Sequence, residues 1–295
     1  MNKQRVSTSA TLPHHRGLNH RGPDFRGPNF RGSAIRRLVG VVGSVSRTPG
    51  TLAGPGVLLL TLMLAATASH QAWAQASCPI PDTLALHDIV LPAAKQEVAT
   101  DRHLTVLTFG GVSSVGSDAI VKGETFPARL EAALTAALPE IQVTVANETP
   151  PGKTSSEVPP ELPALIAKTG AKLVIWGPGG RDVAAHVDLD VFANAVKGGI
   201  DAARRGGADL ILLDTTFVPS PVRMAMIEAY RDRLLSAAAA NHVPLLRRHG
   251  MMRTWGEDGT LNLAARDPAE RELVVRHLFT CVAEGLAAPI AEAVR

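Results

Sequence analysis

Short apolar runs alternate with longer amphipathic stretches along residues 78–295. The runs are rich in Val, Ile and Leu, as is typical of strands that are covered on both faces of a sheet. They span residues 104–109, 142–146, 172–176, 209–214 and 244–247. Between them, apolar residues recur at helical spacing, which predicts helices over residues 126–138, 189–205, 221–241 and from about 268 to the end. The alternation predicts an α/β fold, in which right-handed crossovers join about five parallel strands into one doubly wound sheet.

The first 56 residues differ in composition from the rest. They hold nine of the 30 Lys and Arg residues but one of the 27 Asp and Glu residues, and an Arg-Gly pair recurs every five residues from Arg16-Gly17 to Arg31-Gly32. Arg-Gly tracts can bind nucleic acid through charge and stacking. Such a composition cannot build a hydrophobic core, however. We therefore expect residues 1–56 to be a disordered basic leader, and we expect no nucleic-acid binding by the mature form.

Residues 57–74 predict a signal peptide. An apolar run from Val57 to Ala66 follows the basic leader, and Ala72-Trp-Ala74 then supplies a small-x-small cleavage site. The apolar run is shorter than the roughly 20 residues of a membrane span, so no stable membrane anchor is expected. Cleavage near Ala74 would leave a mature domain of residues 75–295 in the periplasm or outside the cell. This domain would be mildly acidic, with a net negative formal charge.

The chain has two cysteines, Cys78 and Cys281. In an oxidising compartment we expect them to form a disulfide between the start of the mature domain and the last helix. The alternative is two free thiols, one of them packed as a small apolar residue. The histidines at positions 103, 186, 242 and 249 show no metal-ligand spacing. We expect neither a metal nor a cofactor.

The most informative segment is the first apolar run with the glycine-rich turn that follows it, Gly110-Gly-Val-Ser-Ser-Val-Gly116. Open α/β folds bind ligands at such turns, at the carboxyl ends of parallel strands. The turn lacks the Gly-Lys-Ser/Thr ending of a P-loop. Together with residues 125–131, 172–176, 187–192 and 243–248, it resembles the SGNH/GDSL hydrolases, esterases of which one exported bacterial branch is most similar. The resemblance is spread over most of residues 78–293 and implies a three-layer, flavodoxin-like fold.

In active members of that family, a first-motif serine attacks an ester carbonyl. Backbone donors from that serine and a second-motif glycine, with a third-motif asparagine, stabilise the developing oxyanion. Aligned with these motifs, this chain has Val112 at the nucleophile position and Arg181 at the asparagine position. Gly152 retains the second-motif glycine. The resemblance therefore implies a site of the family's architecture that has lost its attacking hydroxyl.

The family's closing motif is an aspartate followed three residues later by the histidine that removes the serine proton. Alignment on Phe279-Thr-Cys281 puts Glu270 at the aspartate and Leu273 at the histidine. An alternative register puts Leu261 and Ala264 at these positions. In either register the general base is missing, and general acid–base catalysis contributes about 10²–10⁴-fold to such reactions.

These departures predict an exported, catalytically degenerate SGNH/GDSL hydrolase. It would retain a cleft for a small acylated or anionic ligand, with Gly111, Gly152 and Arg181 as ligand-binding residues. The alternative is an active esterase that removes acyl groups from carbohydrate or lipid, with Ser113 or Ser114 as a shifted nucleophile. Both serines can equally be turn residues that bond to nearby backbone.

Arg181 and the residues after the last short strand also have two interpretations. Arg181 could hold a carboxylate or phosphate through two parallel hydrogen bonds, or form an ion pair with Asp182 or another neighbouring acid. Met251, Met252 and Trp255 are expected in a loop over the edge of the sheet, where packing is the default explanation for large apolar side chains.

Overall fold

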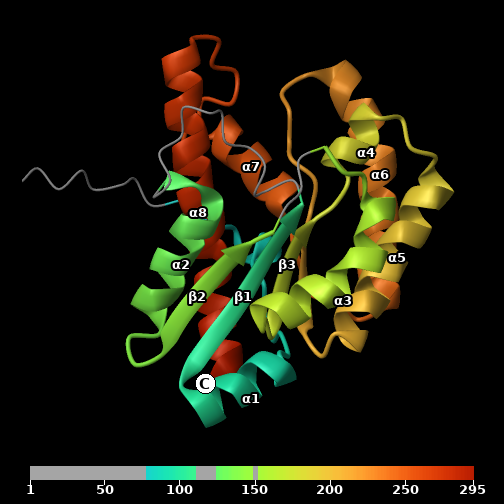
Figure 1. Ribbon diagram of the computed structural model, residues 1–295. Helices are drawn as coiled ribbons and strands as arrows, with labels where there is room; N and C mark the ends of the chain where they lie inside the picture. The colour runs from blue at the N-terminus through green and yellow to red at the C-terminus, as the bar shows by residue number, and fades with distance from the viewer. Residues whose placement is uncertain (1–77, 111–123, 149–151) are drawn as a thin grey trace, which may run out of the picture. The chain divides into compact units, whose positions relative to one another are not determined.

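The computed structural model describes residues 78–110, 124–148 and 152–295. Among these residues, five parallel strands form one sheet in the order β2-β1-β3-β4-β5 (Figure 1). The strands are His103–Gly110 (β1), Gln142–Asn147 (β2), Leu173–Gly177 (β3), Asp209–Leu213 (β4) and Leu245–Leu246 (β5). This is the strand order of flavodoxin-like doubly wound folds, so the predicted fold class is confirmed. The predicted leader and signal peptide lie outside the described residues.

Helices cover both faces of the sheet and make a three-layer structure (Figure 1). One layer contains α1 (Pro92–Asp101), α2 (Phe126–Ala137), α7 (Arg248–Glu257) and α8 (Pro268–Val294). The other contains α3 (Val158–Thr169), α5 (Leu189–Arg205) and α6 (Pro221–Ala240), with the short α4 (Gly180–Ala184) beside them.

The central strands are buried on both faces. In β3, Leu173 and Ile175 belong to the first core, whereas Val174 and Trp176 belong to the second. Each of these side chains is at most 1% exposed. This explains the uninterrupted apolar runs, because alternate residues of a strand point to opposite layers.

Gly199 in α5 packs against Trp176 at the end of β3. A Cβ atom added at Gly199 would lie 2.2 Å from Cζ3 of Trp176. A glycine inside a helix costs about 1 kcal/mol relative to alanine, and here it makes room for the indole. The large ring in turn supports the end of β3, where the strand leads into the candidate site.

Two of the differences from the predicted elements have a clear physical reason. The helix α3 was not predicted, because Pro159, Pro160 and Pro163 suggest a loop. Pro159 and Pro160 lie in its first turn, where proline is tolerated because those amides have no partner within the helix. The segment after residue 247 was expected to be a loop, but it forms the helix α7. Its two methionines and its tryptophan are buried, which agrees with the packing role expected for them.

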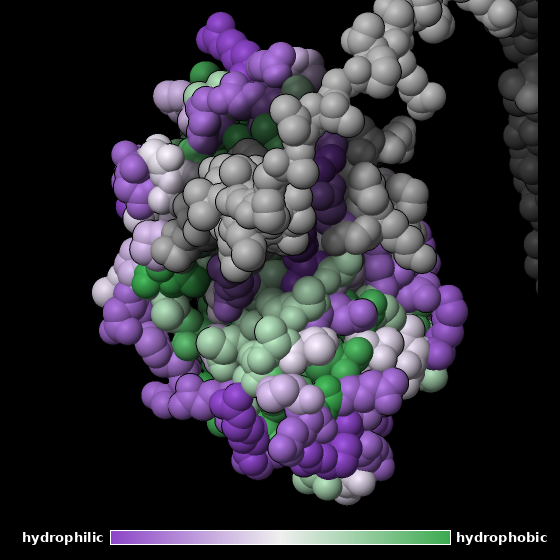
Figure 2. All heavy atoms as spheres, turned by 90° about the vertical axis from the view of Figure 1, so that its left-hand side faces the viewer, coloured by the Kyte–Doolittle hydropathy of each residue, from purple (hydrophilic) through white to green (hydrophobic). Residues whose placement is uncertain are grey.

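The last helix is tied to the start of the described domain. The predicted disulfide between Cys78 and Cys281 is present. By length and composition α8 is apolar enough to cross a membrane, and residues from Phe279 to Val294 supply its buried face in the first core. Figure 2 shows the face over α2 and α8, with weakly hydrophobic residues surrounded by hydrophilic ones. Alanines of both helices line a shallow groove there.

Candidate functional site

A cleft of about 330 Å³ opens among the described residues at the carboxyl ends of the central strands. Its lining includes Gly110 at the end of β1, Gly177 at the end of β3 and Thr216 shortly after β4. This is the edge at which open α/β sheets bind ligands. The glycine-rich segment after the first apolar run indicated this edge from the sequence.

Gly110 begins that turn with a positive φ of 82°. A Cβ atom there would lie 2.9 Å from the carbonyl oxygen of Gly177 and 2.9 Å from Cδ1 of Trp176. Both the backbone conformation and the close approach therefore require glycine. The predicted positions Gly111, Val112, Ser113 and Ser114 follow directly and lie outside the described residues.

The structure brings two of the predicted positions together. Arg181 donates a hydrogen bond from Nε to the carbonyl oxygen of Gly152, at 3.0 Å, and both residues line the cleft. The ion pair between Arg181 and Asp182 that the sequence left open does not form. Arg181 is instead an exposed cation at the cleft, oriented by the second-motif backbone.

Asp182 is buried and holds the loops of the cleft in place. Its carboxylate accepts hydrogen bonds from the Ser155 amide (2.9 Å), the Ser155 hydroxyl (2.7 Å) and the Gly179 amide (3.2 Å). A buried carboxylate needs such donors to offset its desolvation. Asp182 therefore joins the short helix Ser155–Glu157 to the turn after β3 and has a structural role.

Arg248 is the cation that sequence analysis missed. It is 4% exposed, begins α7 and lines the cleft. Its Nε donates to the backbone oxygen of Asp214 at 2.8 Å. Burial lowers the pKa of the Arg248 guanidinium to about 10, although the nearby Asp214 charge raises it. The guanidinium is still protonated at neutral pH, so the cleft contains a desolvated positive charge.

The carboxylate that could neutralise Arg248 is used elsewhere. Asp214 accepts from the Thr215 amide at 2.8 Å through Oδ1 and from Arg231 Nε at 2.9 Å through Oδ2. Within the described part of the chain, neither terminal nitrogen of Arg248 has a hydrogen bond or an ion pair. Lys153, which also lines the cleft, pairs with Glu161. Among the residues that the structure describes, Arg248 and Arg181 therefore supply the unpaired positive charge of the cleft. The sequence signal was the pair Arg247-Arg248 at the end of the last apolar run.

The predicted acid and base positions lie elsewhere. Glu270 and Leu273 are in the first turns of α8 and do not line the described part of the cleft. Glu270 Oε1 accepts a hydrogen bond from Asn262 at 2.6 Å, and Leu273 is 65% exposed. In the alternative register, Leu261 is buried in the core. Neither alignment of the closing motif therefore places a general base at the cleft.

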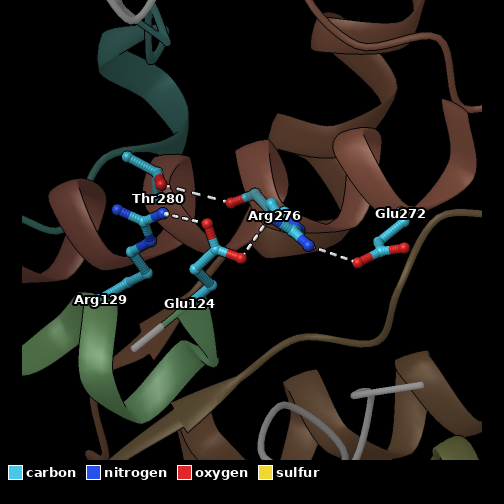
Figure 3. Close-up of polar contacts among 5 residues, drawn as sticks. All are labelled: Glu124, Arg129, Glu272, Arg276 and Thr280. Carbon is cyan, nitrogen blue, oxygen red and sulfur yellow. Dashed lines mark hydrogen bonds and ion pairs between the residues drawn. The ribbon is translucent and has the colours of Figure 1, made fainter. Parts of the chain in front are cut away.

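The first half of α8 instead takes part in a charged cluster with the start of α2, shown in Figure 3. Arg276 pairs with both Glu272 and Glu124. Arg129 lies 3.8 Å from the second oxygen of Glu124. The four side chains are only 26–28% exposed. This part of α8 therefore holds α2 in place through ion pairs.

Of the four histidines weighed from the sequence, His249 is the buried one. Its ring packs edge-on against Phe217, with 5.5 Å between centroids, and its Nε2 has no hydrogen bond within the described residues. Desolvation lowers the pKa of His249, and the charge of Arg231 lowers it further. A neutral packing histidine fits these surroundings.

Solved structures with similar coordinates are mostly described as esterases or lipases. The crystal structure of TesA is 21% identical, covers 60% of this chain and 97% of that chain, and has a TM-score of 0.47. The psychrotrophic esterase EstA from Pseudoalteromonas sp. is 14% identical, with coverages of 60% and 96% and a TM-score of 0.46. The acetyl xylan esterase AlAXEase is 13% identical, with coverages of 61% and 100% and a TM-score of 0.49.

No curated protein matches this chain. The sequence profile of the non-GDSL lipase-like family matches residues 77–295. The match spans the sheet, both helical layers and the cleft, and it confirms the resemblance that the glycine-rich turn and the short strands indicated. The chain therefore belongs to the non-GDSL lipase-like family.

Proposed function

We propose that this protein binds a small anionic ligand, a carboxylate or a phosphate, in the cleft at the carboxyl ends of β1, β3 and β4, and that it does not hydrolyse esters. The observation that carries the proposal is the buried guanidinium of Arg248. Its Nε is held by the Asp214 carbonyl, and its charge has no carboxylate partner among the described residues.

A buried, unpaired cation is costly, because its desolvation is not repaid. An anion that enters the cleft would repay it with charge-assisted hydrogen bonds to the guanidinium. Arginine suits this role because its planar group matches carboxylate and phosphate geometry. Arg181, fixed at the cleft by the Gly152 carbonyl, adds a second positive charge. Both charges attract an anion and neither supplies a nucleophile.

The lack of catalysis follows from the residues at the family's reactive positions. The aliphatic side chains of Val112 and Leu273 can neither attack a carbonyl nor accept a proton. Without an activating base, a neighbouring serine hydroxyl is a weak nucleophile.

Anion binding is tested with inorganic phosphate and with acetate, by calorimetry on the full chain. Loss of one charge-assisted hydrogen-bonding group costs about 1.5–3 kcal/mol, so Arg248→Met should weaken binding by about 10–100-fold. Arg253→Met is the matched control, because Arg253 is also on α7 but is exposed and pairs with Glu257. Equal phosphate binding by Arg248→Met and the parent protein would exclude this site.

The absence of catalysis is tested with a fluorophosphonate probe and p-nitrophenyl acetate. We expect neither labelling nor hydrolysis, and we expect Val112→Ser alone to restore neither. Labelling that disappears in Ser113→Ala or Ser114→Ala would instead establish the rearranged esterase.

We also propose that the protein is exported. The apolar run before Ala74 supports this, as does the disulfide, since structural disulfides persist mainly in oxidising compartments. Amino-terminal sequencing of protein recovered outside the cytoplasm should give a start near Gln75. Recovery of a full-length cytoplasmic form with its Arg-Gly leader would contradict export.

A further inference from the structure

Three potential metal ligands meet on the side of α8, outside the lining of the cleft. His277 and Cys281 are four residues apart in the helix, a spacing that places both side chains on the same face. Cys78 approaches from the segment before the short helix Asp82–Leu84. Nε2 of His277 lies 3.6 Å from Sγ of Cys78, and the three ligand atoms all lie within 4.8 Å of one another.

Two sulfurs and one imidazole nitrogen form a donor set that suits a borderline-soft divalent ion. Zinc binds Cys sulfur at about 2.3 Å and His nitrogen at about 2.0–2.1 Å, and three protein ligands with one open position are sufficient. Around a tetrahedral ion with such bond lengths, ligand atoms lie within about 4 Å of one another. The spacing in this structure is close to that requirement. While the two sulfurs are joined to each other, they are not available as thiolates.

The surroundings would hold Cys78 in place after reduction of the disulfide. Trp255 Nε1 in α7 donates to the Pro79 carbonyl at 2.8 Å. Ile80 packs so closely on α8 that a Cβ atom added at Gly285 would lie 2.9 Å from its Cδ1 atom. Cys281 is fully buried, whereas His277 is half-buried and leaves an approach from solvent. The site is therefore sheltered, partly open and anchored independently of the S–S bond.

We propose that the reduced protein binds one Zn²⁺ ion through Cys78, His277 and Cys281, so that the disulfide and the metal site are alternative states of the same residues. A dithiol reductant supplies two electrons and two protons to the S–S bond and becomes a disulfide itself. Zinc then displaces the two thiol protons as both sulfurs become thiolate ligands. A disulfide oxidant then accepts two electrons from the thiolates, takes up two protons and becomes a pair of thiols, while the protein disulfide re-forms and Zn²⁺ is released. Zinc occupancy would thereby report the redox state of the compartment.

The test uses the full chain, reduced with a phosphine under argon, freed of reductant and titrated with Co²⁺ as a spectroscopic probe. We expect one ion per chain, thiolate-to-cobalt charge-transfer absorption, displacement by Zn²⁺ and no absorption from the oxidised protein. His277→Ala should weaken binding by more than the roughly 10–100-fold that loss of a second-shell group costs. His103→Ala is the matched control, because His103 lies on β1 and contacts Thr144. Equal cobalt binding by His277→Ala, or no binding by folded reduced protein, would overturn the proposal.

A second measurement covers the case in which the reduced chain unfolds. The oxidised protein is equilibrated in a glutathione redox buffer with and without Zn²⁺, and the thiol content is measured by alkylation and mass spectrometry. Free zinc at about 100 times its dissociation constant should shift the equilibrium towards the dithiol by about 100-fold. His277→Ala should abolish most of this shift. A thiol content that zinc does not change would also refute the metal site.

Discussion

The cleft at the sheet edge and the first half of α8 hold the two sets of positions at which the family resemblance predicts site residues, and the two regions differ in character. The cleft lies at the carboxyl ends of the central strands, and Gly152, Arg181 and the buried Arg248 are among the residues that line it. In the first half of α8, Leu273 is exposed, and Arg276 joins the helix to Glu124 at the start of α2 through an ion pair. The first region is open to a ligand, whereas ion pairs between side chains fill the second.

The physical reason for the difference is where each region is anchored. The cleft is a consequence of the parallel sheet, because strand ends and the turns after them form it whatever side chains they carry. The acid and base of a triad depend on single side chains of a peripheral segment. Their loss leaves the sheet intact. A binding site can therefore outlast the catalytic residues, and changes in the two regions should have separable effects.

The largest effect should come from removing the covalent tie of α8. The disulfide joins cysteines 203 residues apart in sequence. Its removal in the double variant Cys78→Ser/Cys281→Ser should lower the free energy of unfolding by about 2–5 kcal/mol, as for other native disulfides. Urea denaturation measures this change. Phosphate affinity should be unchanged in the folded protein, and a parallel loss of affinity would show that the two regions are coupled.

A smaller loss of stability should follow from Glu124→Gln in the charged cluster. The substitution removes the carboxylate between Arg276 and Arg129, whose side chains are mostly buried. We expect a loss of about 1–2 kcal/mol, between the values typical of exposed and buried ion pairs. Glu140→Gln is the control, because the Glu140 side chain is 82% exposed in its pair with Arg102. This substitution should lower the free energy of unfolding by less than about 0.5 kcal/mol. Equal losses in both variants would refute a specific role for the cluster.

In the cleft, Arg181→Met should weaken phosphate binding less than Arg248→Met does. Arg181 is exposed, so solvent screens its charge, and we expect a change of about 0.2–1 kcal/mol. Stability in urea should be unaffected. A calorimetric loss for Arg181→Met that matched the loss for Arg248→Met would mean that both groups contact the anion in a desolvated site.

The smallest effect concerns pH and the buried His249. Because burial lowers its pKa in the folded state, the unfolded chain takes up a proton at a higher pH than the folded protein does. The resulting loss of stability begins as the pH falls through about 6.5, the ordinary value for histidine, and is complete below the folded pKa. His249→Leu should therefore lose less stability than the parent between pH 7 and pH 5, as measured by urea denaturation at each pH. Parallel pH profiles would contradict a buried neutral histidine.

Much of the fold could be predicted because its signals are local. The buried strands appear as apolar runs, and with two cysteines in the chain the pairing of Cys78 with Cys281 required no choice between partners. The helix α3 was missed because its early prolines resemble a loop signal until their position in the first turn is known. The edge of the sheet that carries the cleft was also predictable, from the glycine turn.

The sequence by itself determined the α/β class and the family, and it places a valine at position 112. The tertiary structure alone decided what the charges do. The buried carboxylate of Asp182 accepts a hydrogen bond from Ser155. Arg231 in α6 forms an ion pair with the Asp214 carboxylate, which would otherwise be available to Arg248. Such competition between side chains from different elements has no local pattern, because it depends on which groups the fold brings within hydrogen-bonding distance and removes from water.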